Sequence, residues 1–278
     1  MGSAAGAAPA DDLRLHIDSG DTAWQRRADG HIEGRARPQQ IGQAIAEYEA
    51  ALALAPENLE ARWKLMRALF FLGEHVVSET QIRIDIFERG RQLGEEGMDQ
   101  VATEVGGRDR MLDLSAVQLK AKIADPTAAA EIYFWSAVQT GLWGRTRGKL
   151  ASARQGVATK IRDYASISIA LDPTVEHGGG HRILGRLHTE APKIPFITGW
   201  IDRAVAIAEL ETCSRISPED LTTKLYLAEA LIEFAPKRKE EGLEMLRMLI
   251  ASETDPLWLV EELKAQDDAR ALLEPFAD

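Results

Sequence analysis

Residues 44–56, AIAEYEAALALAP, place alanine at positions 44 and 51, tyrosine at 48 and proline at 56. This spacing is typical of the second helix of a tetratricopeptide repeat. The two alanines allow neighbouring helices to approach closely, and Tyr48 fills the groove beside them. Pro56 ends the helix because proline cannot donate an interior hydrogen bond. The stretch therefore predicts one helix of a helical hairpin.

The same register continues into the next part of the chain. If Pro56 closes a repeat of roughly 34 residues, the following repeat begins at Leu59. Leu65, Ala68 and Gly73 then take the leucine, alanine and turn-glycine positions of a first helix. Because one register accounts for two consecutive segments, we expect helices packed in hairpins.

Similar segments follow downstream, where Pro173, Pro218 and Pro256 each close an amphipathic stretch. Residues 257–277 have the pattern of a terminal helix that covers the last apolar face, as solenoids require. No run of five residues alternates apolar and polar side chains, which argues against strands. The predicted fold is all-α: an α-solenoid of tetratricopeptide-like helical hairpins with a C-terminal capping helix, and at least nine helices.

Two parts of the chain depart from the repeat spacing. Residues 1–20 are expected to be a flexible N-terminal tail, followed by a single helical-repeat domain over residues 21–278. Residues 90–109 carry five glycines and are expected to form a loop with a broken helix. Asp125 and Pro126 then have the pattern of an N-cap and a first helical residue.

The composition limits the classes of function. Lys and Arg number 33 and Asp and Glu 44, a net charge of −11, which argues against general nucleic-acid binding. The one cysteine, Cys213, occupies a small packing position of a repeat helix, so we expect a buried, inert thiol. HExxH, Cys/His clusters and GxSxG are absent from the sequence. We therefore expect no metal, no cofactor and no enzymatic activity.

The run HGGGHR at residues 177–182 is the first candidate binding feature. Three glycines before a helix leave backbone N–H groups open to a ligand, although a plain turn between helices has the same pattern. Two arginines follow, one helical turn apart, and therefore share a face. The candidate residues are the loop glycines Gly178, Gly179 and Gly180, with His181, Arg182 and Arg186.

A basic segment and a group of aromatic residues extend this candidate site. Residues 132–162 hold six basic and no acidic side chains, whereas residues 219–278 hold seven basic and 15 acidic ones. The basic helices either face water or create a local positive field that attracts a small carboxylate. Tyr133, Trp135 and Trp143 either pack in the core or line a cavity. The combined hypothesis is a site for an amphipathic organic acid or a hydrophobic anion.

Two segments, EIYFWSAVQTGLWGR at 131–145 and HGGGHRILGRLHTEAP at 177–192, carry a resemblance to a known family. They are similar to the TatT family, the T component associated with TRAP transporters, and the similarity covers about residues 40–255. It rests on Tyr133 to Trp143, Gly179 to Arg182, Leu184-Gly185 and Ala191-Pro192.

The resemblance implies an exported α-helical repeat protein, often lipid-anchored, that assembles as a homotrimer. It also implies a ligand-accessible pore or cleft and a periplasmic substrate-binding subunit as the partner. The sequence contains no signal-peptide run, and taken by itself is typical of a cytoplasmic protein. The periplasmic location is therefore an implication of the resemblance.

Two functions from different classes follow. The first is a non-enzymatic accessory protein of a TRAP-type uptake system, whose pore or cavity binds or passes a small anionic or hydrophobic ligand. The alternative is a tetratricopeptide-type scaffold that binds a peptide or helix of a partner protein. A closed cavity lined by basic and aromatic residues would favour the first function, and an open charged groove the second.

Overall fold

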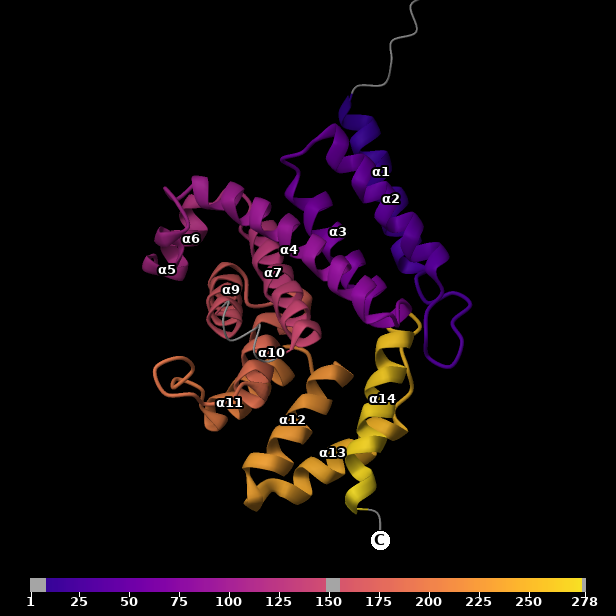
Figure 1. The fold of residues 1–278 in the computed structure, drawn as a ribbon, viewed down its shortest axis with the longest axis vertical. Helices are drawn as coiled ribbons and strands as arrows, with labels where there is room; N and C mark the ends of the chain where they lie inside the picture. Colours follow the sequence, from indigo (N-terminus) through magenta and orange to yellow (C-terminus); the bar gives the residue numbers. More distant parts are fainter. Residues whose placement is uncertain (1–8, 149–155, 277–278) are drawn as a thin grey trace, which may run out of the picture.

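The computed structural model describes residues 9–148 and 156–276 (Figure 1). Within these ranges there are thirteen α-helices and no β-strand, which confirms the all-α prediction. The first seven helices are α1 (Pro9–Gln25), α2 (Pro38–Leu54), α3 (Leu59–Phe71), α4 (Thr80–Thr103), α5 (Asp109–Asp113), α6 (Ala116–Lys122) and α7 (Pro126–Arg147). The others are α9 (Val157–Leu171), α10 (Val175–Glu190), α11 (Arg203–Ile216), α12 (Leu221–Phe234), α13 (Lys239–Ala251) and α14 (Leu259–Leu273).

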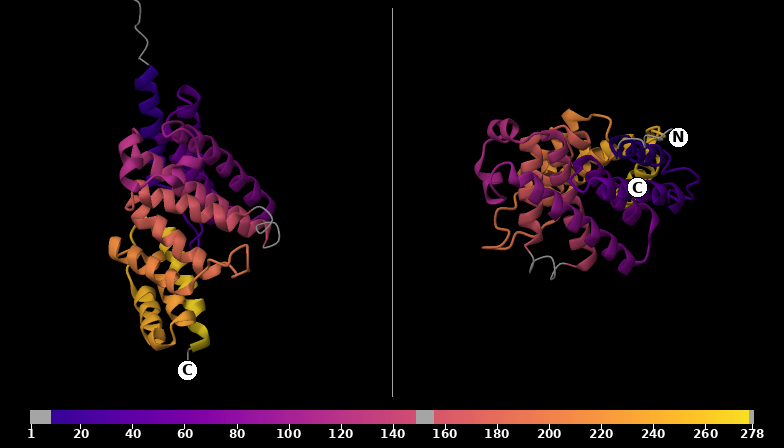
Figure 2. Two further views of the ribbon diagram at one scale, coloured as in Figure 1. Left: turned by 90° about the vertical axis from the view of Figure 1, so that its left-hand side faces the viewer. Right: turned by 90° about the horizontal axis from the view of Figure 1, so that it is seen from above.

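The helices form an α-solenoid of tetratricopeptide-like hairpins. Helix α2 packs on α1 and α3, α7 packs on α3, α4 and α9, and α10 packs on α9 and α11. Helix α14 packs on both α12 and α13, which is the position predicted for a C-terminal cap. Seen from the side, the hairpins stack from the indigo N-terminal helices to the yellow C-terminal ones (Figure 2).

The repeat register deduced from residues 44–56 is confirmed in detail. Helix α3 begins at Leu59, as the register requires. Ala44, Tyr48 and Ala51 are all 0% exposed at the contacts of α2 with its neighbours. A Cβ atom on Gly20 of α1 would overlap the Tyr48 ring, so the glycine allows α1 to lie directly against that ring.

Replacing Ala51 by leucine is expected to lower the free energy of unfolding by about 1–3 kcal/mol, because the larger side chain overpacks the contact of α2 with Ile17 and Ala61. Ala53→Leu is a matched control, since Ala53 lies on the exposed face of the same helix. Urea denaturation followed by circular dichroism measures both variants. Equal midpoints for Ala51→Leu and Ala53→Leu would contradict the register.

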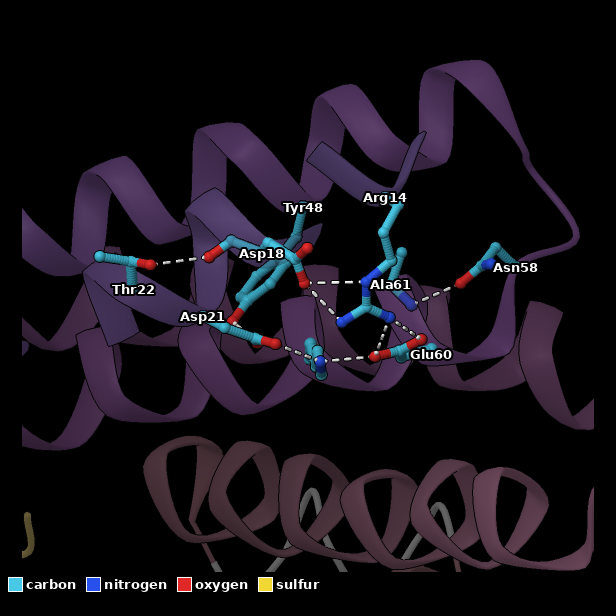
Figure 3. A network of polar contacts seen from close by, with 9 residues as sticks. Arg14, Asp18, Asp21, Thr22, Tyr48, Asn58, Glu60 and Ala61 are labelled. Atoms are coloured by element: carbon cyan, nitrogen blue, oxygen red, sulfur yellow. Dashed lines mark hydrogen bonds and ion pairs between the residues drawn. The ribbon is translucent and has the colours of Figure 1, made fainter. Parts of the chain in front are cut away.

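A polar network fixes the position of α1 over α3 (Figure 3). The Lys64 ammonium on α3 lies 2.6 Å from carboxylate oxygens of both Asp21 and Glu60. The Tyr48 hydroxyl donates to Asp21 at 2.8 Å, and Arg14 bridges Asp18 to Glu60. Because these contacts join three helices, they hold α1 in a fixed place against α2 and α3.

The segment expected to be a broken helix is instead part of the 24-residue helix α4. The loop prediction is wrong for residues 90–103 because the glycines there have a packing function. Gly90, Gly94 and Gly97 share one face, and Cβ atoms on them would overlap side chains, chiefly those of α7. Their lack of side chains lets α4 and α7 approach closely, which compensates for glycine's poor helix propensity.

Two helix starts bear on the predicted boundaries. Asp125 accepts a hydrogen bond from the Ala128 N–H at 2.9 Å and Pro126 opens α7, as predicted. At the N-terminus the structure differs from the expected tail over residues 1–20, since α1 begins at Pro9 and buries Ile17. The helical-repeat domain therefore includes residues before position 21. No helix in the described ranges is long and apolar enough to cross a lipid bilayer.

The last helix of the solenoid returns to the segment that follows the first helix, so the helices form a closed ring. Arg27, which follows α1, is 2% exposed and pairs with Glu261 of α14 at 2.8 Å. Its guanidinium carbon lies 4.2 Å from the Trp24 ring centroid and 4.9 Å from that of Trp258. Val260 is buried in the same apolar cluster as Tyr48. We call Trp24, Arg27, Trp258 and Glu261 the clasp.

Candidate functional site

A cavity of about 1240 Å³ lies inside the ring. Its walls come from α1, α3, α7, the start of α9, α10, α12, the segment before α14 with the start of that helix, and residues 191–198. Most of the wall is apolar, with side chains that include Phe70, Phe134, Trp135, Val138, Leu142 and Ile183. Small-molecule pockets commonly measure roughly 300–1,000 Å³, so this space suits a large or elongated ligand.

Helix α7 is the central element of the site because other helices surround it. Its residues are apolar on all sides, which is typical of a fully buried helix. Three successive aromatic residues therefore point to three different neighbours. Tyr133 contacts Tyr164 of α9, Phe134 contacts Gly179 of α10, and Trp135 faces the cavity beside Phe70.

The structure brings only one of the three predicted aromatic residues to the cavity. Trp135 lines it, with its ring centroid 5.4 Å from that of Phe70. Tyr133 is buried against α9, and Trp143 is buried beneath the Arg91 guanidinium at 4.3 Å. These two residues have the core-packing position that was the alternative to a cavity wall.

The glycine run forms the kinked first turn of α10. Glu176, His177 and Gly178 are consecutive left-handed residues with φ of 46°, 61° and 79°. This conformation is uncommon for residues with a Cβ, so the turn stores strain at the cavity wall, which Glu176 and His177 line. Gly179 and Gly180 sit directly against Phe134 and Ile169, so the predicted loop glycines pack against α7 and α9 and do not line the cavity.

The predicted basic residues of α10 are held in ion pairs. Arg182 pairs with Asp220, and Arg186 pairs with Glu190 at 2.6 Å and with Glu229. Both arginines line the cavity, with most of each side chain buried.

His181 behaves differently, because its Nδ1 lies 2.6 Å from Glu209 on α11, outside the cavity lining. The basic segment before α10 is also partly neutralised, since Arg145 pairs with Glu74 and Arg162 with Asp163. Lys149 and Arg154 lie outside the described residues.

The sequence reasoning missed Arg67, which lies at the clasp end of the cavity, and Glu131, which is buried next to residues that line it. The Arg67 guanidinium lines the cavity, 4.1 Å from the Trp24 ring centroid and 5.0 Å from that of Trp63. It forms no ion pair with any described carboxylate. Glu131 of α7 is 9% exposed, and burial raises the pKa of its carboxyl to about 8.

The surroundings of Glu131 explain this shift. Glu176 raises the pKa of Glu131 further, and the charge of Arg67 opposes the rise. Neither Glu131 Oε2 nor the indole Nε1 of Trp135 forms a well-aligned hydrogen bond. A cation without a carboxylate partner therefore lies at one end of the apolar space, and the neutral carboxyl of Glu131 is buried among groups that line it. One feature of the sequence could have identified Glu131 as unusual, because it is the only charged residue between Asp125 and Arg145.

The remaining chemistry-bearing groups include the histidines, the acidic residues and Cys213. No cluster of three or more His, Cys, Asp or Glu side chains there has the arrangement of a metal site. Cys213 is 0% exposed, and burial raises the pKa of its thiol. This agrees with the packing position predicted for it.

Comparison with known proteins identifies no family for this chain. No protein-family model and no curated protein matches the sequence. The chain is weakly similar to a solved structure described as the TPR2AB-domain:pHSP90-complex of yeast Sti1, with 14% identity and a TM-score of 0.29. The alignment covers 94% of this chain and 99% of that chain. The tetratricopeptide-like assignment accordingly stands on the register and packing described above.

Proposed function

We propose that this protein is a non-catalytic helical-repeat binding protein that holds a mainly apolar small molecule inside its ring. The observation that carries the proposal is the closure of the solenoid around the aromatic-lined cavity of about 1240 Å³. Transfer of apolar surface from water into such a space stabilises a complex by roughly 25 cal/mol per Å². An elongated apolar molecule gains most from this cavity.

The polar groups at the clasp end restrict the ligand further. Arg67 carries a positive charge, whereas the raised pKa of Glu131 leaves that carboxyl mostly protonated near pH 7. Arg182 and Arg186 already have carboxylate partners. We therefore place a single acidic group of the ligand beside Arg67, which makes the ligand an amphipathic organic acid. A guanidinium–carboxylate pair supplies about 1.5–3 kcal/mol.

Filling the cavity is expected to weaken ligand binding at least about tenfold, a loss of about 1.4 kcal/mol. Gly141 of α7 lines the cavity, and a Cβ there would meet only Ile161 at an ordinary 3.5 Å, so Gly141→Leu keeps the helix and occupies the space. Gly42→Leu on α2 is the control, because a Cβ at that position would meet no atom within 4 Å. Calorimetry with hexadecanoic acid measures both variants.

The same titration tests the placement of the acidic group. Arg67→Gln is expected to weaken binding of hexadecanoic acid while leaving binding of hexadecanol unchanged. If neither molecule binds the unchanged protein, or if Gly141→Leu binds as well as Gly42→Leu, the cavity is not the ligand site. If Arg67→Gln affects binding of the acid and of the alcohol equally, the cavity is still the ligand site, but the acidic group of the ligand does not lie beside Arg67.

The resemblance to the TatT family supports a more specific form of the proposal. In that form the protein is an accessory component of a TRAP-type uptake system, located in the periplasm and assembled as a homotrimer. It would pass its ligand to or from a periplasmic substrate-binding subunit. This form depends on the resemblance alone, and co-elution of the two purified proteins in size-exclusion chromatography tests it.

A second candidate function is a tetratricopeptide-type scaffold that binds a peptide or helix of a partner protein. The observation that favours it is an exposed apolar segment at the cavity wall, where Phe196 is fully exposed and Ile197 is 53% exposed. Such a segment gives a partner protein an apolar contact. Absence of fatty-acid binding, together with capture of a partner that Phe196→Ala abolishes, would favour this second function.

A further inference from the structure

A second pocket, of about 400 Å³, lies where five distant parts of the chain meet. The charged groups that line it come from the loop after α1, the short π-helix Leu72–Val76, and helices α4, α7 and α14. They are four cations, Arg35, Arg83, Arg145 and Lys264, and one carboxylate, Glu74. The exposed Ser78 adds a hydroxyl to the wall.

The single carboxylate does not balance the four cations. Glu74, with 10% of its side chain exposed, is shared by Arg83 and by Arg145, the latter at 2.6 Å. Arg83 also donates to the Gly73 carbonyl at 2.8 Å, so it has a structural function. One negative charge shared by two arginines leaves an excess of positive charge in this half of the pocket.

The other two cations add to this excess. Within the described ranges the Arg35 guanidinium donates only to the Val76 carbonyl, at 3.3 Å, and forms no ion pair. Lys264 pairs with Asp268 at 2.8 Å, but both side chains are about half exposed, and such surface pairs contribute little. Both groups are therefore available to an incoming anion.

The positive field extends to the neighbouring His75. Burial lowers the pKa of His75 to about 4; the charge of Glu74 opposes this fall, and the positive charges nearby, chiefly Lys264, add to it. His75 is consequently neutral at pH 7. The protein as a whole has a net charge of −11, so this cluster opposes the overall balance and forms only through closure of the ring.

We propose that this pocket binds a phosphate-type dianion. Guanidinium groups pair with phosphate oxygens in a bidentate manner, a lysine adds a point charge, and a serine hydroxyl donates to the remaining oxygen. The source is either inorganic phosphate or the phosphate monoester headgroup of an amphipathic molecule. The second source has a structural basis, because Arg145 lines both this pocket and the central cavity.

Calorimetry with sodium phosphate at pH 7.5 and low salt tests the site. The variant Arg35→Gln/Lys264→Gln is expected to bind phosphate at least about tenfold more weakly than the unchanged protein. It leaves the contacts among Glu74, Arg83 and Arg145 intact, so thermal unfolding should change little. Arg247→Gln/Arg270→Gln removes two exposed cations that pair within their own helices, and is expected to bind phosphate normally.

Sulfate should compete with phosphate, and dodecyl phosphate distinguishes the two sources. Binding of dodecyl phosphate that is tenfold tighter than that of phosphate, with the advantage lost in Gly141→Leu, identifies a headgroup site continuous with the cavity. Equal affinities identify a site for free phosphate. Absence of binding by both compounds, or equal phosphate binding by the two double variants, overturns the proposal. Phosphate binding does not require the cavity. Gly141→Leu is therefore expected to bind phosphate normally even though it binds hexadecanoic acid weakly, and this difference separates the present proposal from the proposed function.

Discussion

Replacing Arg27 by alanine is expected to lower the free energy of unfolding by about 3–5 kcal/mol, because the change leaves Glu261 buried without its partner. Arg27 is 2% exposed and lies between the rings of Trp24 and Trp258. It also donates to the Leu257 carbonyl, which would lose that hydrogen bond. Removal of this one side chain therefore breaks an ion pair, a hydrogen bond and two contacts with aromatic rings at the same time.

Arg26→Ala provides the control for this change. The Arg26 side chain is 59% exposed and, among the described residues, pairs only with Asp29, so its loss should cost less than about 1 kcal/mol. Urea denaturation followed by circular dichroism compares the two variants. The double variant Arg27→Met/Glu261→Gln is expected to recover part of the loss, because no uncompensated charge stays buried. If Arg27→Ala unfolds at the same urea concentration as Arg26→Ala, the clasp does not hold the ring.

Glu131→Gln is expected to stabilise the protein by roughly 3–5 kcal/mol at pH 8–9 and to have little effect near pH 4. Burial raises the pKa of Glu131 from its ordinary value of 4.5 to about 8. Between pH 4.5 and about pH 8 the Glu131 carboxyl stays protonated in the folded protein, whereas the same carboxyl is ionised in the unfolded chain. The wild type therefore loses stability as the pH rises through this interval, and glutamine removes that loss.

Burial causes most of this pKa shift, and the charged groups around Glu131 modify it. Glu176 and Asp172 raise its pKa, and Arg67 lowers it. Denaturation curves at several pH values between 4 and 9 measure the slope of stability against pH, and Glu57→Gln is a control at an exposed position. A Glu131→Gln variant with the same slope as the Glu57→Gln variant would show that Glu131 ionises normally in the folded protein.

The helical repeats could be predicted because their signals are local. The spacing of Ala44, Tyr48, Ala51 and Pro56 contains the information that one helix needs to pack on the next. The start of α3 at Leu59 follows from the same register. The helix that contains the glycines of α4 could not be predicted in this way. Those glycines are favourable only because they let α7 pack closely, and α7 lies about forty residues further along the sequence.

The candidate site was less predictable for a similar reason. Arg182 and Arg186 do share a helix face at the cavity wall, but their partners Asp220 and Glu229 lie at the start of α12 and within it. Nothing in the sequence near α10 identifies those carboxylates as partners. Arg67 lies within the apolar stretch of a repeat helix, and only the closure of the ring brings it to the cavity.

The clasp also bears on how the protein unfolds. In an open repeat array each unit contacts only its neighbours, so the terminal units fray first and cooperativity weakens with length. Here the linear series of nearest-neighbour interfaces becomes circular, because Arg27 and Val260 join the first and last units. A circular array has no end unit from which melting can spread. Either terminal helix can therefore separate only when the contact with the opposite terminus breaks as well, which couples the stability of both ends.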